Sequence, residues 1–325
     1  MSRLSDLSMI EVVLGGSILL IALGVIFPPD MFFFKQGTNF SVQIMFLFLM
    51  MGMGMLLLKR ERLMFVCLAA SGIIALNLKT FSDQTLKFPS VNANPSLSVA
   101  HIDLSLSEDE ETTLLAIRNH DVDVISFQEY TPFWNRTLPE ALLSQYPFRL
   151  LHPNANPYGK AIFSKFPLCV DEKIVVEGFD DMDFLHVQII MDEGAMTHIV
   201  STQAFPLLND QTYQEIHEYF DHVGSYVTQL EGPVITLGDF SLPPWSEEIK
   251  FFKEVGRLMD SRRDLAQQIS PDRMFLFNIP IEHIFYSYEI ECTAFSVINE
   301  RTSPLGITGN YQLKRFQAFN AIDVE

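Results

Sequence analysis

The first 80 residues contain three long apolar runs, separated by short polar segments. The runs cover residues 10–28, 40–58 and 63–78. Each run comes close to the roughly 17–25 apolar residues that a helix needs to cross a bilayer. A hairpin of helices buried in a large core is the alternative, but three successive runs with charged residues between them favour membrane spans. We therefore expect residues 1–80 to form an anchor of three transmembrane helices.

The positive charges between these runs predict the orientation of the anchor. Lys59, Arg60 and Arg62 form its densest basic cluster, in the turn between the second and third runs. Basic loops stay preferentially in the cytoplasm, so the chain after the third run would lie on the other side of the membrane. We expect a multi-pass protein of the inner (cytoplasmic) membrane with a periplasmic domain.

A polar, proline-containing linker at residues 81–96 precedes a region where short apolar runs alternate with helical patterns. Ser107 and Glu110 have the spacing of a capping box ahead of a helix at Glu111–Asn119. Other helices are expected at Leu138–Ser144, Asp210–Leu230 and Ser246–Val255. The alternating and β-branched segments predict strands at Ser96–Leu104, Val122–Phe127, Lys160–Ser164, Phe184–Ile190, His198–Thr202, Val234–Leu237, Ile281–Tyr286, Cys292–Ile298 and Gly306–Leu313.

This mixture of many strands and several helices predicts an α/β (α+β) domain at residues 97–325. We expect two sheets packed face to face and covered by helices. A single doubly wound parallel sheet is the alternative fold.

The whole chain has a formal charge of −18, and the acidic residues lie almost entirely after the apolar runs. Residues 81–325 hold 36 Asp and Glu against 16 Lys and Arg, a formal charge of −20. Such a domain repels phosphate backbones, because nucleic-acid affinity comes mainly from basic side chains. We expect the membrane and envelope proteins as partners, and no nucleic acid. Cys67, Cys169 and Cys292 have neither a disulfide pattern nor metal-ligand spacing.

Acidic residues stand where several predicted strands begin or end. Asp103 ends the first strand, Glu129 follows the second, Asp239 follows a later one, and Glu282 with His283 opens another. Each of them alone is explained by a cap, a turn or a solvated edge. A sheet can nevertheless hold carboxylates rigidly where a metal and a phosphate would meet, so their combination predicts a site.

The order of these segments and their amino-acid sequences resemble those of the endonuclease/exonuclease/phosphatase superfamily, over about Ser96–Leu313. The most similar segments are Asp123–Glu129, which ends in Gln-Glu, Gly159–Pro167, and Leu237–Ser241, which is close to Gly-Asp-Phe-Asn. The resemblance implies a four-layer α/β sandwich with Mg²⁺-dependent phosphoesterase chemistry. Three spans ahead of such a domain are also similar to bacterial envelope members of the superfamily.

The resemblance also implies roles for individual residues. Glu129 would bind the metal, with Asp103 beside it, and Asp239 would orient or activate the attacking water. In an active enzyme His283 would join Asp239 as a catalytic residue. Because hard cations prefer carboxylate oxygens, the three acidic residues could hold Mg²⁺ weakly.

Several positions depart from the superfamily pattern, and the departures remove proton-transfer and anion-binding groups. General acid–base assistance by a histidine contributes about 10²–10⁴ in rate. The departures are Asp103 for an asparagine, Thr202-Gln203-Ala204 for Thr-His-Leu, Ser241 for the last Asn of Gly-Asp-Phe-Asn, Glu282 for the Asp of Ile-Asp-His, and Thr302-Ser303-Pro304 for Ser-Asp-His.

We therefore expect a catalytically degenerate, membrane-tethered protein that acts by binding, as a scaffold or partner subunit at the envelope. An active phosphoesterase with a relocated acid–base residue is the rival, with His152, His186, His198 or His283 as the imidazole. A third hypothesis assigns partner or bilayer contacts to Trp134 and Trp245, since tryptophan favours both settings.

Overall fold

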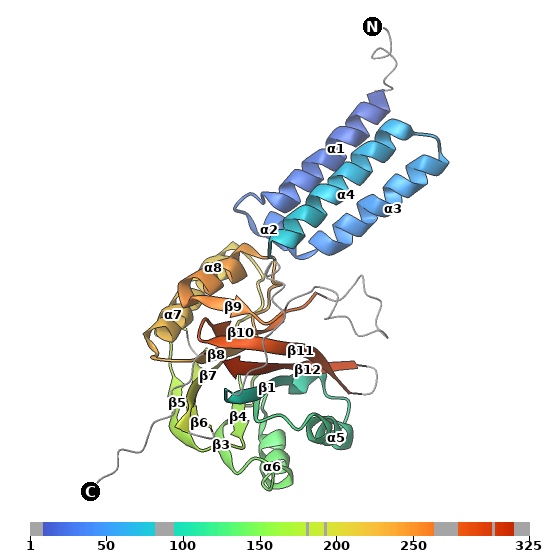
Figure 1. Cartoon of the computed structure of the whole chain (residues 1–325). Helices are drawn as coiled ribbons and strands as arrows, with labels where there is room; N and C mark the ends of the chain where they lie inside the picture. Colours follow the sequence, from blue (N-terminus) through green and yellow to red (C-terminus); the bar gives the residue numbers. More distant parts are fainter. Residues whose placement is uncertain are drawn as a thin grey trace, which may run out of the picture.

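The computed structural model describes residues 9–81, 94–179, 182–191, 194–262, 279–300 and 303–314. Its N-terminal part is helical: α1 (Met9–Ile26), α2 (Phe32–Asn39), α3 (Ser41–Leu57) and α4 (Glu61–Phe81). The helices α1, α3 and α4 coincide with the three predicted apolar runs and lie side by side, apart from the sheets (Figure 1).

Length and composition make two of these helices, α1 and α4, long and apolar enough to cross a membrane. The pair α2 and α3 passes the same test only when the two are taken as one span, and they are bent by 70° at their junction. The count of three spans therefore rests on α3, which has 17 residues. Helix α2 was not predicted.

The strands of the described residues after α4 form two six-stranded sheets. The first sheet has the order β11-β12-β1-β2-β4-β3 and the second has the order β5-β6-β7-β8-β10-β9. The strands of the first sheet are β1 (Ser96–Asp103), β2 (Val124–Gln128), β3 (Phe148–His152), β4 (Lys160–Ser164), β11 (Ile290–Glu300) and β12 (Ser303–Leu313). Those of the second are β5 (Leu168–Ile174), β6 (Phe184–Ile190), β7 (Met196–Gln203), β8 (Val234–Asp239), β9 (Leu258–Asp260) and β10 (Glu282–Ser287).

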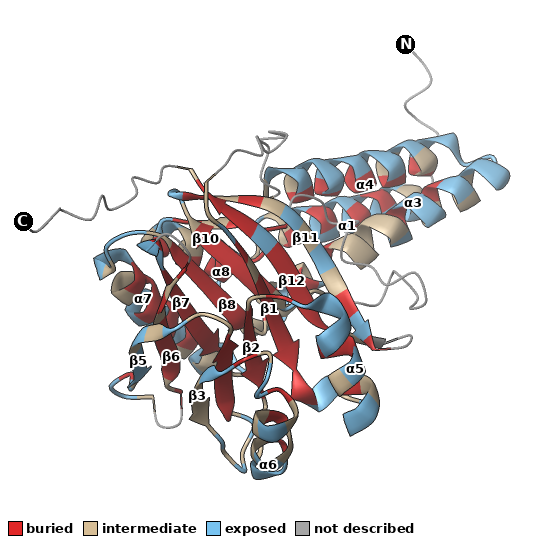
Figure 2. Cartoon of the chain, turned by 60° about the horizontal axis from the view of Figure 1, so that its bottom comes forward, coloured by how far each residue is buried: buried red, intermediate tan, exposed pale blue. Residues whose placement is uncertain are grey.

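Three buried apolar clusters hold these layers together. One lies between the sheets and includes Val99, Ile199 and Ile235. A second joins the first sheet to α5 (Glu110–His120) and α6 (Pro132–Ala141), and a third joins the second sheet to α7 (Asp210–Gln229) and α8 (Glu247–Gly256). Both sheets are consequently buried on both faces over their central strands (Figure 2). The predicted two-sheet α/β sandwich is confirmed.

Strand direction places the ends of four strands at one edge of the sandwich. β1 pairs with β2 in parallel, and β7 pairs with β8 in parallel. All other strand pairs in the described part of the chain are antiparallel, so the alternative of a doubly wound parallel sheet does not apply. The Gln128 side chain accepts a hydrogen bond from the backbone N–H of Asp239 at 3.1 Å and links the two sheets at this edge.

Several predicted elements differ from the observed ones. The capping box was wrong: the N-cap of α5 is Asp109, whose side chain accepts from the backbone N–H of Thr112. Helix α6 begins earlier than predicted, because Thr131 caps it and Pro132 occupies its first turn. The linker at residues 81–96 lies mostly outside the described residues. Strands β3, β5 and β9 were not predicted, and all three lie at sheet edges.

Helix α2 connects the N-terminal helices to the second sheet's layer. The Lys35 ammonium lies 3.3 Å from the Glu248 carboxylate on α8, and the Gln36 side chain donates to the carbonyl oxygen of Leu207 at 3.1 Å. The indole N–H of Trp245 donates to the carbonyl oxygen of Thr38 at 2.8 Å. Trp245 is buried and packs in the cluster of α1, α3 and α4, so its role is to join the two parts of the chain.

Candidate functional site

Four acidic residues meet at the edge where the sheets are linked, and we call them the acidic cluster: Asp103, Glu129, Asp239 and Glu282. Asp103 ends β1 and Glu129 directly follows β2, the strand next to it. Asp239 ends β8 and pairs in register with Glu282 at the start of β10. The charges of Asp103 and Asp239 act on Glu282, and those of Asp103 and Glu129 act on Asp239. The predicted gathering of these residues is observed, with Glu282 as its fourth member.

The backbone is unusual at both motifs that supply the cluster. Glu129 and Ser241 adopt left-handed conformations, with φ of 52° and 55°, and Gly238 has a φ of 152°. Non-glycine residues reach this region rarely, and they do so often at functional sites. The backbone N–H of Ser241 donates to the Asp239 carboxylate at 2.6 Å. This turn holds Asp239 at the end of β8.

Burial raises the pKa values of all four residues of the acidic cluster, and repulsion between carboxylates adds to this for Glu129, Asp239 and Glu282. Burial is the main cause of the raised pKa of Asp103, and burial followed by the charge of Asp103 raises the pKa of Glu129. Burial raises the pKa of Asp239 to about 7, and burial with the charges of Asp103 and Asp239 raises that of Glu282 to about 8. Near neutral pH the cluster therefore keeps part of its protons.

The carboxylates of the acidic cluster are the kind of ligand that a divalent cation prefers, but their positions do not form a site for one. Within the described ranges, no three His, Cys, Asp or Glu side chains are grouped so that one metal ion could bind to all of them. One oxygen of Asp103 accepts from the backbone N–H of Ser105 at 2.9 Å, and one of Asp239 is used by Ser241. The arrangement as described does not fit a protein-bound Mg²⁺ held by three carboxylates.

His283 lies next to the cluster in the chain but faces away from it. Its Nδ1 lies 2.8 Å from the guanidinium of Arg262 and its Nε2–H donates to the carbonyl oxygen of Leu242 at 2.8 Å. Its ring stacks on Phe285, and burial lowers the pKa of His283 to about 4. Successive side chains of a strand point to opposite faces, so Glu282 faces the cluster and His283 faces the helix side. Both ring nitrogens have partners there.

The other histidines proposed as replacements also lie elsewhere. His186 and His198 bond to each other at 2.9 Å on β6 and β7, and Tyr226 of α7 bonds to His186. His198 pairs with Val234 at the opposite end of β8 from Asp239. His152 ends β3, two strands away from β2, and makes no hydrogen bond to a carboxylate of the cluster within the described part of the chain. None of the three therefore supplies an acid–base group within hydrogen-bond reach of Asp239.

Sequence reasoning missed His101, which shares the inward face of β1 with Asp103. Its Nδ1 lies 3.4 Å from the Ser126 hydroxyl, which bonds to the Ser201 hydroxyl on the opposite sheet at 2.7 Å. Burial lowers the pKa of His101 to about 3, partly offset by the Gln128 side chain. The two-residue spacing from Asp103 was the available signal. The imidazole is neutral and buried between the sheets.

The substituted motif positions lie around the same edge. Gln203 pairs in register with Asp239, is 5% exposed, and has no hydrogen-bond partner for its Oε1 among the described residues. Pro304 lies on β12, beside the end of β1. Thr302 is outside the described residues. Two positions that carry histidines in the superfamily pattern thus hold an amide and a proline at the cluster.

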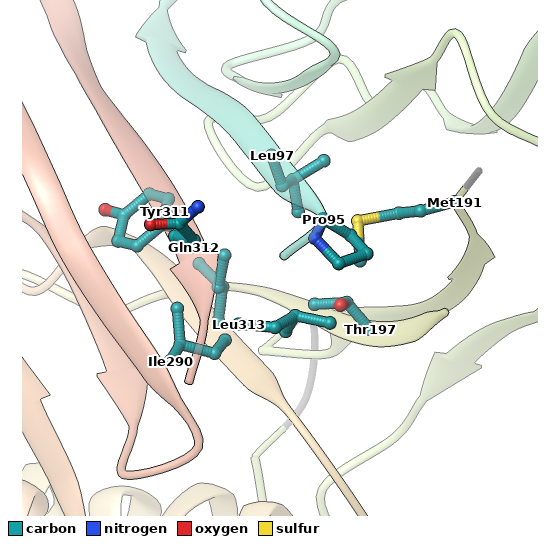
Figure 3. Close-up of a pocket in the computed structure, with 9 residues that line it drawn as sticks. Pro95, Leu97, Met191, Thr197, Ile290, Tyr311, Gln312 and Leu313 are labelled. Carbon is teal, nitrogen blue, oxygen red and sulfur yellow. The ribbon is translucent and has the colours of Figure 1, made fainter. Parts of the chain in front are cut away.

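A small apolar cavity lies at the opposite end of the sandwich from the cluster. Figure 3 shows the side chains of Pro95, Leu97, Met191 and Leu313 around it, from the start of β1, the segment after β6 and the end of β12. Its volume is about 10 Å³, which is room for no more than one water molecule. It is too small for an organic ligand.

Comparison with known proteins settles the family. The model of the endonuclease/exonuclease/phosphatase family matches residues 108–303. The chain belongs to this family. The resemblance in the sequence motifs is therefore confirmed, and the four acidic residues occupy the edge that those motifs predicted. None of the curated proteins compared matches the chain.

Solved structures share the family fold at low sequence identity. An endonuclease/exonuclease/phosphatase from Beutenbergia cavernae has 16% identity and a TM-score of 0.54, covering 67% of this chain and 72% of that one. A protein of the family from Bacteroides vulgatus has 11% identity and a TM-score of 0.54, covering 68% and 100%. The catalytic domain of human Nocturnin has 16% identity and a TM-score of 0.53, covering 69% and 96%. At these identities the likeness establishes the fold alone.

Proposed function

We propose that this family member is a membrane-tethered binding protein of the bacterial envelope that does not hydrolyse phosphate esters. In this proposal it acts as a scaffold or partner subunit, and its domain lies on the periplasmic side of the inner membrane. The observation that carries the proposal is that, among the described residues, no imidazole bonds to a carboxylate of the acidic cluster: His283 faces away, and Gln203 and Pro304 replace the family's histidines.

The geometry of the N-terminal helices supports the proposed tether. With α1, α3 and α4 as spans, the segment between α1 and α3 and the domain after α4 must lie on the same side of the bilayer. Helix α2 of that segment contacts α8 through Lys35 and Glu248, at the end of the bundle nearest the sheets (Figure 1). The basic turn at Lys59 and Arg60 lies at the other end, where the positive-inside rule places it in the cytoplasm.

The absence of hydrolysis can be tested with the full chain in detergent or liposomes. We expect no turnover of phosphodiester, phosphomonoester or phospholipid-headgroup substrates with Mg²⁺ or Mn²⁺, because the positioned histidine that typically supplies about 10²–10⁴ in rate is missing. Glu129→Ala and Asp239→Ala should then leave the measured turnover at the same background level. The exposed residue Glu140 on α6 provides a control variant, Glu140→Ala. Turnover that both cluster variants abolish and Glu140→Ala retains would overturn the proposal in favour of an active phosphoesterase.

The proposed sidedness can be tested through one native thiol. Cys169 on β5 is exposed, whereas Cys67 and Cys292 are buried. A membrane-impermeant maleimide added to intact spheroplasts should therefore label the chain at Cys169, with the label lost in Cys169→Ser. Protection in spheroplasts combined with labelling after lysis would place the domain in the cytoplasm and contradict the proposed orientation.

A further inference from the structure

Helix α2 is turned away from the direction of the neighbouring apolar helix. The axes of α2 and α3 meet at 70°, with the break at Phe40. If α3 crosses the bilayer near its normal, the 70° bend sets α2 at about 20° to the membrane plane. Because α2 directly precedes α3, it lies at the depth where that span begins. Its eight residues therefore run along the surface of the bilayer and not through it.

One face of α2 is covered by the domain. Phe32 packs edge-on against Tyr213 of α7 with ring centroids 6.0 Å apart, and the Lys35 ammonium lies 5.0 Å from the centre of the same ring. Lys35 and Gln36 bind Glu248 and Leu207. Residues 32, 35 and 36 have the spacing of one helical face. This face therefore has its partner within the chain.

The opposite face of α2 is apolar and exposed. Phe33 is 79% exposed, and Phe34 beside it is 39% exposed and reaches Gly24 of α1. Met31 and Phe27, just before the helix, are also exposed. Lys35, the charged residue of α2, lies on the covered face and is paired with Asp30 at 2.9 Å and with Glu248; the Asp30 carboxylate is itself exposed just before the helix. The apolar surface continues onto the exposed leucines and isoleucines of α1.

We propose that α2 is an interfacial helix whose Phe33 face lies in the lipid headgroup layer and whose other face holds the domain against the bilayer. The occupant of the Phe33 face is lipid, because this face continues the exposed apolar surface of α1. Aromatic side chains on the apolar face of an in-plane helix favour this depth. This proposal rests on the proposed membrane tether and adds the position of the sandwich domain relative to the bilayer.

The orientation of the acidic cluster follows from this contact. The segments that touch α2 leave the carboxyl ends of β7 and β8, through Leu207 and Trp245. Asp239 ends β8 at the same edge. Leu208, on the first of these segments, is 71% exposed beside the contact. The edge that bears the cluster is therefore held next to the bilayer, so a ligand would reach it from the headgroup layer.

Spin-label accessibility in liposomes of phosphatidylethanolamine and phosphatidylglycerol tests the proposal on the full chain. Cys169→Ser removes the exposed thiol, and single cysteines are then placed at Phe33, at Leu20 in the middle of α1, and at Leu143 on the far side of the domain. All three native side chains are exposed and apolar. The label at position 33 should collide several-fold more with oxygen, relative to a water-soluble nickel chelate, than the label at position 143.

The three positions separate the two proposals. A lipid-exposed label at 20 with a water-exposed label at 33 would overturn the interfacial helix and leave the tether intact. A label at 33 shielded from both reagents would show a protein partner or a second copy on this face and would likewise overturn it. A label at 20 that behaves like the one at 143 would overturn the membrane tether itself. Retained contact of Trp245 with Thr38, followed by its fluorescence in a Trp134→Phe background, checks that the variants are folded.

Discussion

Replacing Gly238 by alanine is expected to prevent the sandwich domain from folding stably, with a loss above about 4 kcal/mol. A Cβ at this position would lie 1.7 Å from the carbonyl oxygen of Thr202, and φ is 152°, where side chains are strained. The overlap is with backbone of the paired strand β7, which cannot move without breaking the parallel register with β8. Because whole domains are stable by about 5–15 kcal/mol, a loss of this size removes much of the total.

Urea unfolding of the full chain, followed by tryptophan fluorescence, measures this effect through buried Trp134 on α6. Gly178→Ala is the matched control, because Gly178 also has a positive φ, 86°, but a methyl group added there would meet nothing within 4 Å. We expect this control to cost about 1–2 kcal/mol. Equal midpoints for the two variants would contradict the close approach of β7 and β8 at the motif.

Raising the pH from 5 to 8 is expected to destabilise the domain, and Glu282→Gln is expected to remove a large part of this loss. Folding raises the pKa of Glu282 to about 8 and that of Asp239 to about 7, mainly through burial. At any pH between the unfolded pKa values, near 4, and these folded pKa values, the folded state binds more protons than the unfolded state. The stabilising contribution of these two groups is therefore fully present below about pH 4. As the pH rises toward their folded pKa values, the free energy of unfolding falls by up to about 1.4 kcal/mol per pH unit for each group.

Urea unfolding at pH 5 and pH 8 measures the slope. Glu140→Gln, at an exposed position on α6, should keep the wild-type pH dependence, whereas Glu282→Gln should flatten it. A wild-type chain that is as stable at pH 8 as at pH 5 in the absence of divalent ions would contradict the electrostatics of the acidic cluster. Added Mg²⁺ that restores stability at pH 8 would instead reveal cation binding by these carboxylates.

The site could be predicted from the sequence as far as its carboxylates, but not as far as its imidazoles. The predicted strand ends and the motif sequences located Asp103, Glu129 and Asp239, because neighbouring parallel strands end at the same edge of a sheet. The orientation of His283 could not be read from the motif, because it depends on Arg262 and Leu242, which reach it from other segments. The metal-ligand and catalytic roles of these residues remain predictions.

The sequence by itself determined the three apolar helices, the central strands buried on both faces, and the family, because long apolar runs and local motifs are properties of neighbouring residues. It missed β3 and β5, since these edge strands are half-exposed and lack a continuous apolar run, and it missed β9, which is largely buried but has only three residues. Only the tertiary structure decided how α2 is used. Its eight residues have little helical signal alone, and contacts with Tyr213, Trp245 and Glu248, more than 170 residues later in the chain, fix its position.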